Sequence, residues 1–285
     1  MSKKREGESF IDRAWQQFKK NKGGIIGLIL TIVFVFIAIF GPYISPYDPL
    51  QVDYGEKLKA PSFKFILGTD YMGRDMLSRL LTGARLSLSV GFIAIGIGLF
   101  FGGLLGILAG FFEKLDNIIM RFVDIFLAFP GLLLSITIVA VLGPGLQNVM
   151  IALGISSIPS YARLVRGEVL KVKENEYIEA AEALGISNPI IIYRHLIPNI
   201  LSSIIVVTTF RLARTILSAS ALSFLGLGAQ PPNPEWGMII NEGRNYMLSA
   251  PWLILAPGGF ITLAILGFNL LGDGLRDALD PRFNS

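Results

Sequence analysis

The sequence predicts an all-α integral membrane protein with about six transmembrane helices. Of its 285 residues, 52% are hydrophobic and only 16% are charged, whereas soluble domains usually carry about 25% charged residues. The uncharged residues gather in runs of the length, about 20 residues, that a helix needs to cross a hydrocarbon core of about 30 Å. The chain contains no cysteine, which excludes disulfides and thiolate metal sites.

The charge-free runs set the positions of the expected spans. The 38 uncharged residues from Ile125 to Ala162 are too many for one helix, and Gly143-Pro144-Gly145 divides them into a helical hairpin. The other expected spans are residues 24–42, 86–112, 198–222 and a helix within 245–272 that begins near Pro251. On the second span, glycine recurs every four residues at Gly98, Gly102, Gly106 and Gly110. This spacing permits close approach of another helix or of a partner protein.

The distribution of lysine and arginine predicts that both termini are cytoplasmic. In that orientation the cytoplasmic segments contain sixteen basic residues and the outer loops contain six. The expected organisation is a cytoplasmic segment 1–23, a first helix 24–42, an external loop 43–84, and a membrane core 85–285 with a cytoplasmic loop at about 164–197 and an external loop at about 226–250. An N-terminal signal peptide is the alternative, but no small-x-small cleavage site follows the first apolar stretch.

An acidic, alanine-rich helix is expected in the cytoplasmic loop. Its apolar and small residues share one face, formed by Tyr177, Ile178, Ala181, Leu184 and Gly185, and its acids share the other, formed by Glu176, Glu179 and Glu182. A helix that lies on lipid is one interpretation, but anionic headgroups disfavour an acidic face. We therefore interpret the helix as a docking element for another protein. His195, the one histidine of the chain, lies in the same loop and is expected to be structural.

Several sequence blocks resemble permease subunits of bacterial ABC importers. Glu179-Ala180-Ala181-x-x-x-Gly185, followed by Pro198, resembles their cytoplasmic EAA loop. The blocks LGTDYMGRD from Leu67, LSFLGLG from Leu222 and FNLLGDGLRDALDP from Phe268 are similar to the dipeptide/oligopeptide/nickel permease family, in its second-subunit branch. The general EAA pattern has Ile and Leu shortly before its proline, where this chain has His195 and Ile197. The peptide branch often carries Arg-His at this point.

The resemblance implies a type I ABC importer architecture in which this chain forms half of the transmembrane pathway. It implies a coupling helix that contacts an ATPase subunit through Tyr177, Ile178, Glu179, Ala180, Ala181, Leu184 and Gly185. The chain has no Gly-x-x-x-x-Gly-Lys-Ser/Thr motif, so we expect no cofactor in this chain, with ATP and Mg²⁺ bound by the partner ATPase subunits. The implied partners are a related second permease subunit, two ATPase subunits and an extracytoplasmic binding protein. The implied location is the cytoplasmic membrane of a bacterium or archaeon.

Charged residues in the external blocks allow two interpretations. Asp70, Arg74, Asp75 and Glu235 either form a docking surface for a substrate-binding protein or belong to a self-contained cap held by internal Asp–Arg pairs. Trp236, which follows a stiff Pro-rich stretch, is expected to anchor the chain at the membrane–water boundary.

Arg211 and Arg214 lie within the fifth expected span. Arginines in a span are costly and usually face a cavity or a partner. They either line the substrate pathway and attract carboxylate groups, or pair with acids of the second permease subunit, or extend toward the membrane surface.

Peptides are the expected cargo, and nickel or a metal chelate is the alternative within the same family. No feature of the sequence separates these two. An ion-coupled carrier or channel would be expected to show an internal repeat or a broken helix with polar ligands at the midplane, and an embedded enzyme would need an intramembrane catalytic cluster. We find neither pattern in the sequence.

Overall fold

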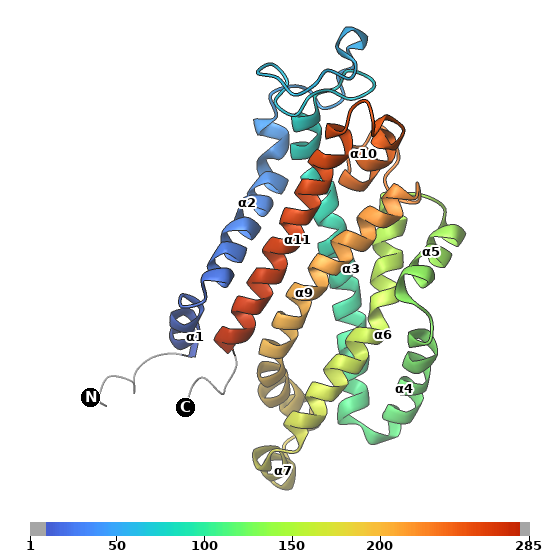
Figure 1. Cartoon of the computed structure of the whole chain (residues 1–285). Coiled ribbons are helices and arrows are strands. Elements are labelled where there is room, and N and C mark those ends of the chain that lie inside the picture. The colour runs from blue at the N-terminus through green and yellow to red at the C-terminus, as the bar shows by residue number, and fades with distance from the viewer. Residues whose placement is uncertain (1–9, 280–285) are drawn as a thin grey trace, which may run out of the picture.

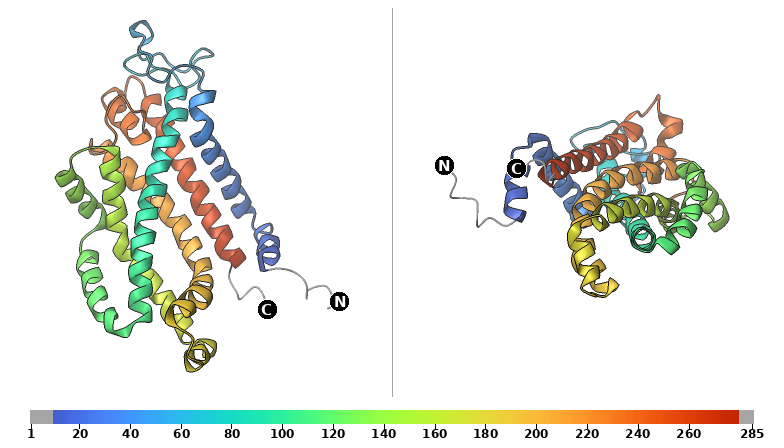
Figure 2. Two further views of the ribbon diagram at one scale, coloured as in Figure 1. Left: turned by 180° about the vertical axis from the view of Figure 1, so that it is seen from behind. Right: turned by 90° about the horizontal axis from the view of Figure 1, so that it is seen from below.

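The chain is all-helical, as its sequence predicts. The computed structural model describes residues 10–279, and these contain no β-strand. Five long helices of this part form an elongated bundle (Figure 1). They are α2 (Lys22–Ile44), α3 (Met76–Phe111), α6 (Leu146–Lys173), α9 (Ile197–Phe224) and α11 (Trp252–Leu279). Helix α3 packs against α6, and α11 lies between α2 and α9 (Figures 1 and 2).

The two ends of the bundle carry different short elements. Helices α1 (Phe10–Phe18) and α7 (Glu176–Ala183) lie at the end where α11 finishes (Figure 1). The loop 45–75, with the short helix η1 (Tyr54–Glu56), lies at the opposite end together with α10 (Trp236–Gly243) and η3 (Arg244–Tyr246). Both ends of the described chain are therefore on one side, as two cytoplasmic termini require. The side of the membrane that they face stays a prediction.

The number of spans differs from the expected six. Within residues 10–279, four helical stretches are long and apolar enough to cross a membrane: α2, α3, the run Asn188–Phe224 and α11. A bent pair, α4 (Glu113–Leu127) and α5 (Gly131–Leu142), raises the number to five if it counts as one span. Helix α6 has the same length as α11, 28 residues. It is more polar, however, and is not counted among the helices apolar enough to cross a membrane.

The expected helical hairpin over residues 125–162 is wrong in its first arm. The chain does break at Gly143-Pro144-Gly145, between α5 and α6. It also breaks before Pro130, where α4 and α5 meet at 86°. Proline has no N–H to donate to a helix and disfavours a helical conformation in the preceding residue. Pro130 therefore ends one helix and begins the next.

The expected junction at Pro198 is a continuous helix. Helix α8 (Asn188–Ile191) passes into a π-helical turn, Ile192–Leu196, and then directly into α9. In this turn the N–H of Ile197 bonds to the carbonyl of Ile192. Pro198 then occupies the first turn of α9, where a missing N–H is tolerated.

The glycine stripe of α3 brings this helix close to α6. A Cβ atom built on Gly102 would lie 2.5 Å from the carbonyl oxygen of Ile158, and one on Gly106 would lie 2.6 Å from that of Ala162. One on Gly98 would lie 1.8 Å from the Ser157 hydroxyl, and one on Gly110 would lie 2.6 Å from the Val169 side chain. The two backbones can approach this closely only because the stripe has no side chains. The prediction of close helix approach is confirmed, with another span of the same chain as the partner.

Replacing Gly102 by alanine should therefore separate α3 from α6. The new methyl group meets backbone, which cannot rotate away, and such overpacking costs roughly 1–3 kcal/mol. The measurement is the melting temperature of the purified permease in detergent. Gly103→Ala is the control, because a Cβ at Gly103 meets nothing within 4 Å. Equal melting temperatures for the two variants would contradict the proposed contact.

Candidate functional site

Helix α7 projects from the end of α6 and forms the tip of the molecule (Figure 1). Its last turn is closed by hydrogen bonds from the N–H of Ile186 to the carbonyl of Ala181, 3.1 Å, and from the N–H of Gly185 to that of Glu182, 2.9 Å. Gly185 has a φ of +75°, in the left-handed region. Glycine populates this region without steric cost, so Gly185 allows the sharp turn from α7 into the next helix.

Part of the apolar face of α7 is turned into the chain itself. Ile178 is 1% exposed and Ala181 is 6% exposed. They belong to a cluster of buried side chains drawn from α3, α6 and the segment that follows α7: Phe111, Val165, Val169, Ile191, Leu196 and Ile200. The expectation that Ile178 and Ala181 face a partner is therefore wrong. Helical periodicity reveals an apolar face but not whether it packs against the same chain or another one.

The exposed side of α7 contains a strip of small and apolar residues bordered by acids. Leu184 is 81% exposed and Tyr177 is 44% exposed, and Ala180 and Ala183, which lie between them along the chain, are also exposed. Glu176 and Glu179 border this strip and are exposed as well. We call Tyr177, Ala180, Ala183 and Leu184 the α7 strip. His195 packs beside it, with its ring centroid 6.3 Å from that of Tyr177.

The charged residues of the external loop form a buried network. The Nε of Arg74 donates to Asp70 at 2.6 Å, and Arg79 also donates to Asp70. Glu242, on α10, accepts from Arg79 at 2.7 Å and from Arg74 at 3.2 Å. All four side chains are less than 10% exposed. This network joins the external loop to α3 and α10, so Asp70 and Arg74 are not available as a docking surface.

The remaining two expected docking residues are helix caps. Asp75 caps α3 by accepting from the N–H of Ser78 at 2.8 Å. Glu235 caps α10 by accepting from the N–H of Met238 at 3.0 Å, and it also accepts from Ser87 at 3.1 Å. Burial raises the pKa of the Glu235 carboxyl. The self-contained cap was one of two interpretations, and the burial of all four residues favours it over the docking surface.

Trp236 is a core residue and not an anchor at the membrane boundary. Its side chain is completely buried, its ring nitrogen donates to the carbonyl of Leu80 at 3.0 Å, and its ring meets Phe34 and Phe260 edge to face. A buried tryptophan usually finds such a partner for its N–H.

A second candidate site is a polar cleft of about 510 Å³ between α5, α6 and α9. Its polar lining consists of two arginines, five serines, a threonine and a tyrosine: Arg211, Arg214, Ser135, Ser156, Ser157, Ser160, Ser218, Thr215 and Tyr161. The Nη2 of Arg211 donates to the carbonyl of Ser160 at 3.4 Å, and its guanidinium carbon lies 4.6 Å from the ring centroid of Tyr161. Arg214 is exposed in the cleft. Among the described residues, neither arginine forms an ion pair with an acid, which leaves the two positive charges unneutralised within this part of the chain.

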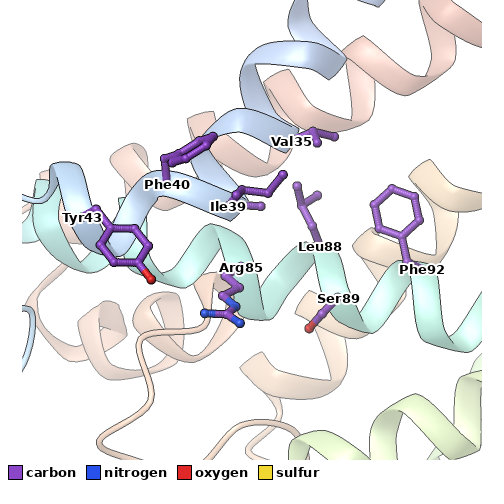
Figure 3. Close-up of a pocket in the computed structure, with 9 residues that line it drawn as sticks. Val35, Ile39, Phe40, Tyr43, Arg85, Leu88, Ser89 and Phe92 are labelled. Carbon is purple, nitrogen blue, oxygen red and sulfur yellow. The ribbon is translucent and has the colours of Figure 1, made fainter.

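A larger groove of about 780 Å³ lies between α2 and α3. Its walls are mostly aliphatic and aromatic: Ile39 and Phe40 from α2 and Leu88 and Phe92 from α3 lie around it (Figure 3). Arg85 is its one charged lining residue. This lining offers little to a polar cargo, so the arginine cleft is the better candidate for binding.

The helical bundle, its spanning helices and the protruding loop helix define the chain as a membrane-embedded permease subunit. Residues 98–285 match the family described as the inner membrane component of binding-protein-dependent transport systems. Residues 9–61 match the N-terminal transmembrane domain of oligopeptide transport permease C. The chain belongs to the family of binding-protein-dependent transport system inner membrane components, and it is a permease subunit of an ABC transporter. It is a transport component without an ATPase site of its own.

Curated relatives match over nearly the whole chain. The dipeptide transport system permease protein DppC of Alkalihalophilus pseudofirmus is 49% identical over 95% of this chain and 90% of its own. The glutathione transport system permease protein GsiD of Pectobacterium atrosepticum is 45% identical over 95% of this chain and 91% of its own. The di/tripeptide transport system permease protein DppC of Pseudomonas aeruginosa is 45% identical over 95% of this chain and 92% of its own.

A solved structure has the same fold. A chain of the inward-facing MetNI methionine ABC transporter superposes with a TM-score of 0.60 and 21% identity, over 72% of this chain and 98% of that one. This likeness concerns the fold alone.

The buried network should make Glu242 essential for stability. Glu242→Gln removes one of two carboxylates from a site that holds two buried guanidinium groups, and breaking a buried ion pair costs about 3–5 kcal/mol. We expect a large fall in the melting temperature of the purified protein. The control is Glu56→Gln, because Glu56 pairs with Lys64 at 2.7 Å on the exposed surface of the same loop. Loss of this exposed ion pair should change the melting temperature little. Similar changes in melting temperature for the two variants would contradict the stabilising role of the buried network.

Proposed function

We propose that this chain forms half of the transmembrane pathway of an ATP-driven importer of short peptides. The observation that carries the proposal is the 49% identity with a dipeptide transport permease over 95% of the chain. The relatives named for di/tripeptide and glutathione transport support the same cargo class. Glutathione is itself a short peptide derivative, so the cargoes of these three relatives belong to one chemical class.

The α7 strip is the surface that we assign to the ATPase subunit. A groove on that subunit would cover Tyr177, Ala180, Ala183 and Leu184, and Glu179 at the edge would meet a basic side chain or a backbone donor. Gly185 shapes the turn behind the strip. Ile178 and Ala181 have a different role, since they tie the helix to its own chain. ATP and Mg²⁺ would be bound by the partner and not by this chain.

The proposed assembly contains this chain, a related second permease subunit, two ATPase subunits and an extracytoplasmic binding protein. The family is by description a component of binding-protein-dependent systems of the inner membrane, which supports the need for partners in general. The curated relatives named above are bacterial, which supports a bacterial cytoplasmic membrane.

The cargo is tested by uptake in a strain that lacks this gene. Radiolabelled Ala-Ala, a labelled tripeptide and labelled nickel are offered to the strain with and without the restored gene. We expect the restored gene to return peptide uptake and to leave nickel uptake unchanged. Uptake of nickel alone would replace the peptide proposal with the metal alternative of the same family.

The coupling role predicts that Leu184→Glu uncouples the ATPase. A charge within the α7 strip would be buried without a partner in the proposed interface, and each such charge is strongly unfavourable. We expect at least tenfold less ATPase subunit to copurify with the tagged permease, since a loss of about 1.4 kcal/mol already gives a factor of ten.

The matched control is Leu248→Glu. Leu248 is 96% exposed and lies near η3, at the other end of the bundle from α7. Both variants should reach the membrane in similar amounts by immunoblot. Normal ATPase copurification with Leu184→Glu would remove the α7 strip from the interface.

A further inference from the structure

Two arginines line one cleft of the bundle, and no acid of the described residues pairs with either of them. Arg211 and Arg214 lie near the middle of α9 and line the same cleft. Bringing cations into a membrane protein at this depth is costly unless they pair or face a polar cavity. Across the described residues, the ion pairs of the chain involve other arginines and lysines. The cleft therefore carries two positive charges that receive no counter-charge from the described part of the chain.

Arg211 is held in place but not fully hydrogen-bonded. Its ring contact with Tyr161 and its bond to the Ser160 carbonyl fix the guanidinium against the α6 wall. Its Nε is buried and has no partner within the described part of the chain. A guanidinium has five N–H donors, and leaving a buried donor unpaired costs free energy. Because Arg211 also lines the cleft, its guanidinium is a charged group that a ligand in the cleft would meet.

The serines around the arginines are already engaged as donors. Ser157 donates to the carbonyl of Gly154 at 2.8 Å. Ser135 and Ser156 bond to each other at 2.9 Å, and the one that accepts in this pair can donate to its own helix carbonyl, Gly131 or Leu153. Their oxygens remain available to accept a hydrogen bond. The cleft therefore offers strong cationic donors at the arginines and neutral acceptors on the opposite walls. This combination fits a ligand with a carboxylate at one point and N–H groups at others, which is the chemistry of a short peptide.

We propose that Arg211 and Arg214 form a carboxylate subsite in the translocation pathway, with the C-terminal carboxylate of the cargo peptide as its ligand. The proposal rests on the proposed peptide cargo. A free C-terminus, with a pKa of about 3.3–3.7, is ionised at neutral pH, and arginine binds carboxylates through two parallel hydrogen bonds. The cleft volume of about 510 Å³ lies within the range of small-molecule sites, about 300–1,000 Å³. An acidic side chain of the peptide offers the same group and is separated by the experiment below.

The test compares uptake of peptides that differ only in one carboxylate. Ala-Ala, its C-terminal amide, Ala-Glu and Ala-Gln are measured in the strain with wild-type protein, Arg211→Gln or Arg214→Gln. The binding protein is the same in all strains, so its own preferences cancel in the ratio of variant to wild type. Removing a charge-assisted hydrogen bond should lower uptake of Ala-Ala roughly tenfold or more, and uptake of the amide should stay unchanged relative to wild type.

A second measurement does not depend on transport. The chain has no cysteine, so Ser218→Cys provides a single thiol in the cleft for an anionic and a cationic methanethiosulfonate reagent. In the assembled complex the anionic reagent should react faster, and Arg211→Gln with Arg214→Gln should remove this preference. Arg85→Gln is the control, because Arg85 lies in the other groove (Figure 3) and should change neither measurement.

Each outcome has a distinct meaning. Equal losses for the free acid and the amide, or no charge preference of the thiol, would overturn the subsite. A larger loss for Ala-Glu than for Ala-Gln, with Ala-Ala unaffected, would overturn the C-terminal assignment in favour of an acidic side chain. A wild-type strain that imports none of the four peptides would refute the peptide cargo, while the thiol measurement would still report on the cleft.

Discussion

The close contact between α3 and α6 positions both candidate sites. At one level of this contact, Gly98 of α3 makes room for Ser157 and Tyr161 of α6, and these two residues line the arginine cleft. Three turns further along, Gly110 makes room for Val169, which lies beneath Ile178 of α7. The glycines of α3 therefore set how closely α6 approaches, and α6 in turn positions both a wall of the cleft and the residues on which α7 packs.

Two of the arginine pairs among the described residues have opposite surroundings. Arg74 and Arg79 are buried at the external end, where Asp70 and Glu242 balance them charge for charge. Arg211 and Arg214 lie in the cleft, where the described part of the chain supplies no acid. Buried charges persist when they are paired and hydrogen-bonded. The first pair has its acids within the fold, and we propose that a carboxylate of the cargo supplies the negative charge for the second.

The sequence was sufficient wherever the signal was local. Runs without charge located the long helices, and the spacing of Gly98 to Gly110 predicted a close helix contact. The break at Pro130 was missed because Gly143-Pro144-Gly145 gave a stronger signal within the same apolar run. Helices α4 and α5 meet there at 86°, at a point where the hydropathy of the sequence does not change.

Contacts between distant parts of the chain could not be predicted in the same way. Glu242 lies 163 residues from Arg79, and no local pattern connects them. The same limit applies to the face of α7, because an apolar residue has the same periodicity whether it packs within the chain or against a partner. Ile178 and Ala181 are buried within the chain, whereas Tyr177 and Leu184 are exposed.

This division of the α7 face has a mechanical consequence. Ile178 and Ala181 pack on side chains from α6 and α9, among them Val165 and Ile200. The same two helices carry Tyr161 and Arg211 into the arginine cleft, whereas the third wall, around Ser135 of α5, has no direct link to α7 in this cluster. Packed cores transmit displacement because they resist compression. If an ATPase subunit moves α7 through its exposed strip, the displacement would pass through this packing to α6 and α9, so a force applied at one end would reach the cleft that we assign to the cargo carboxylate.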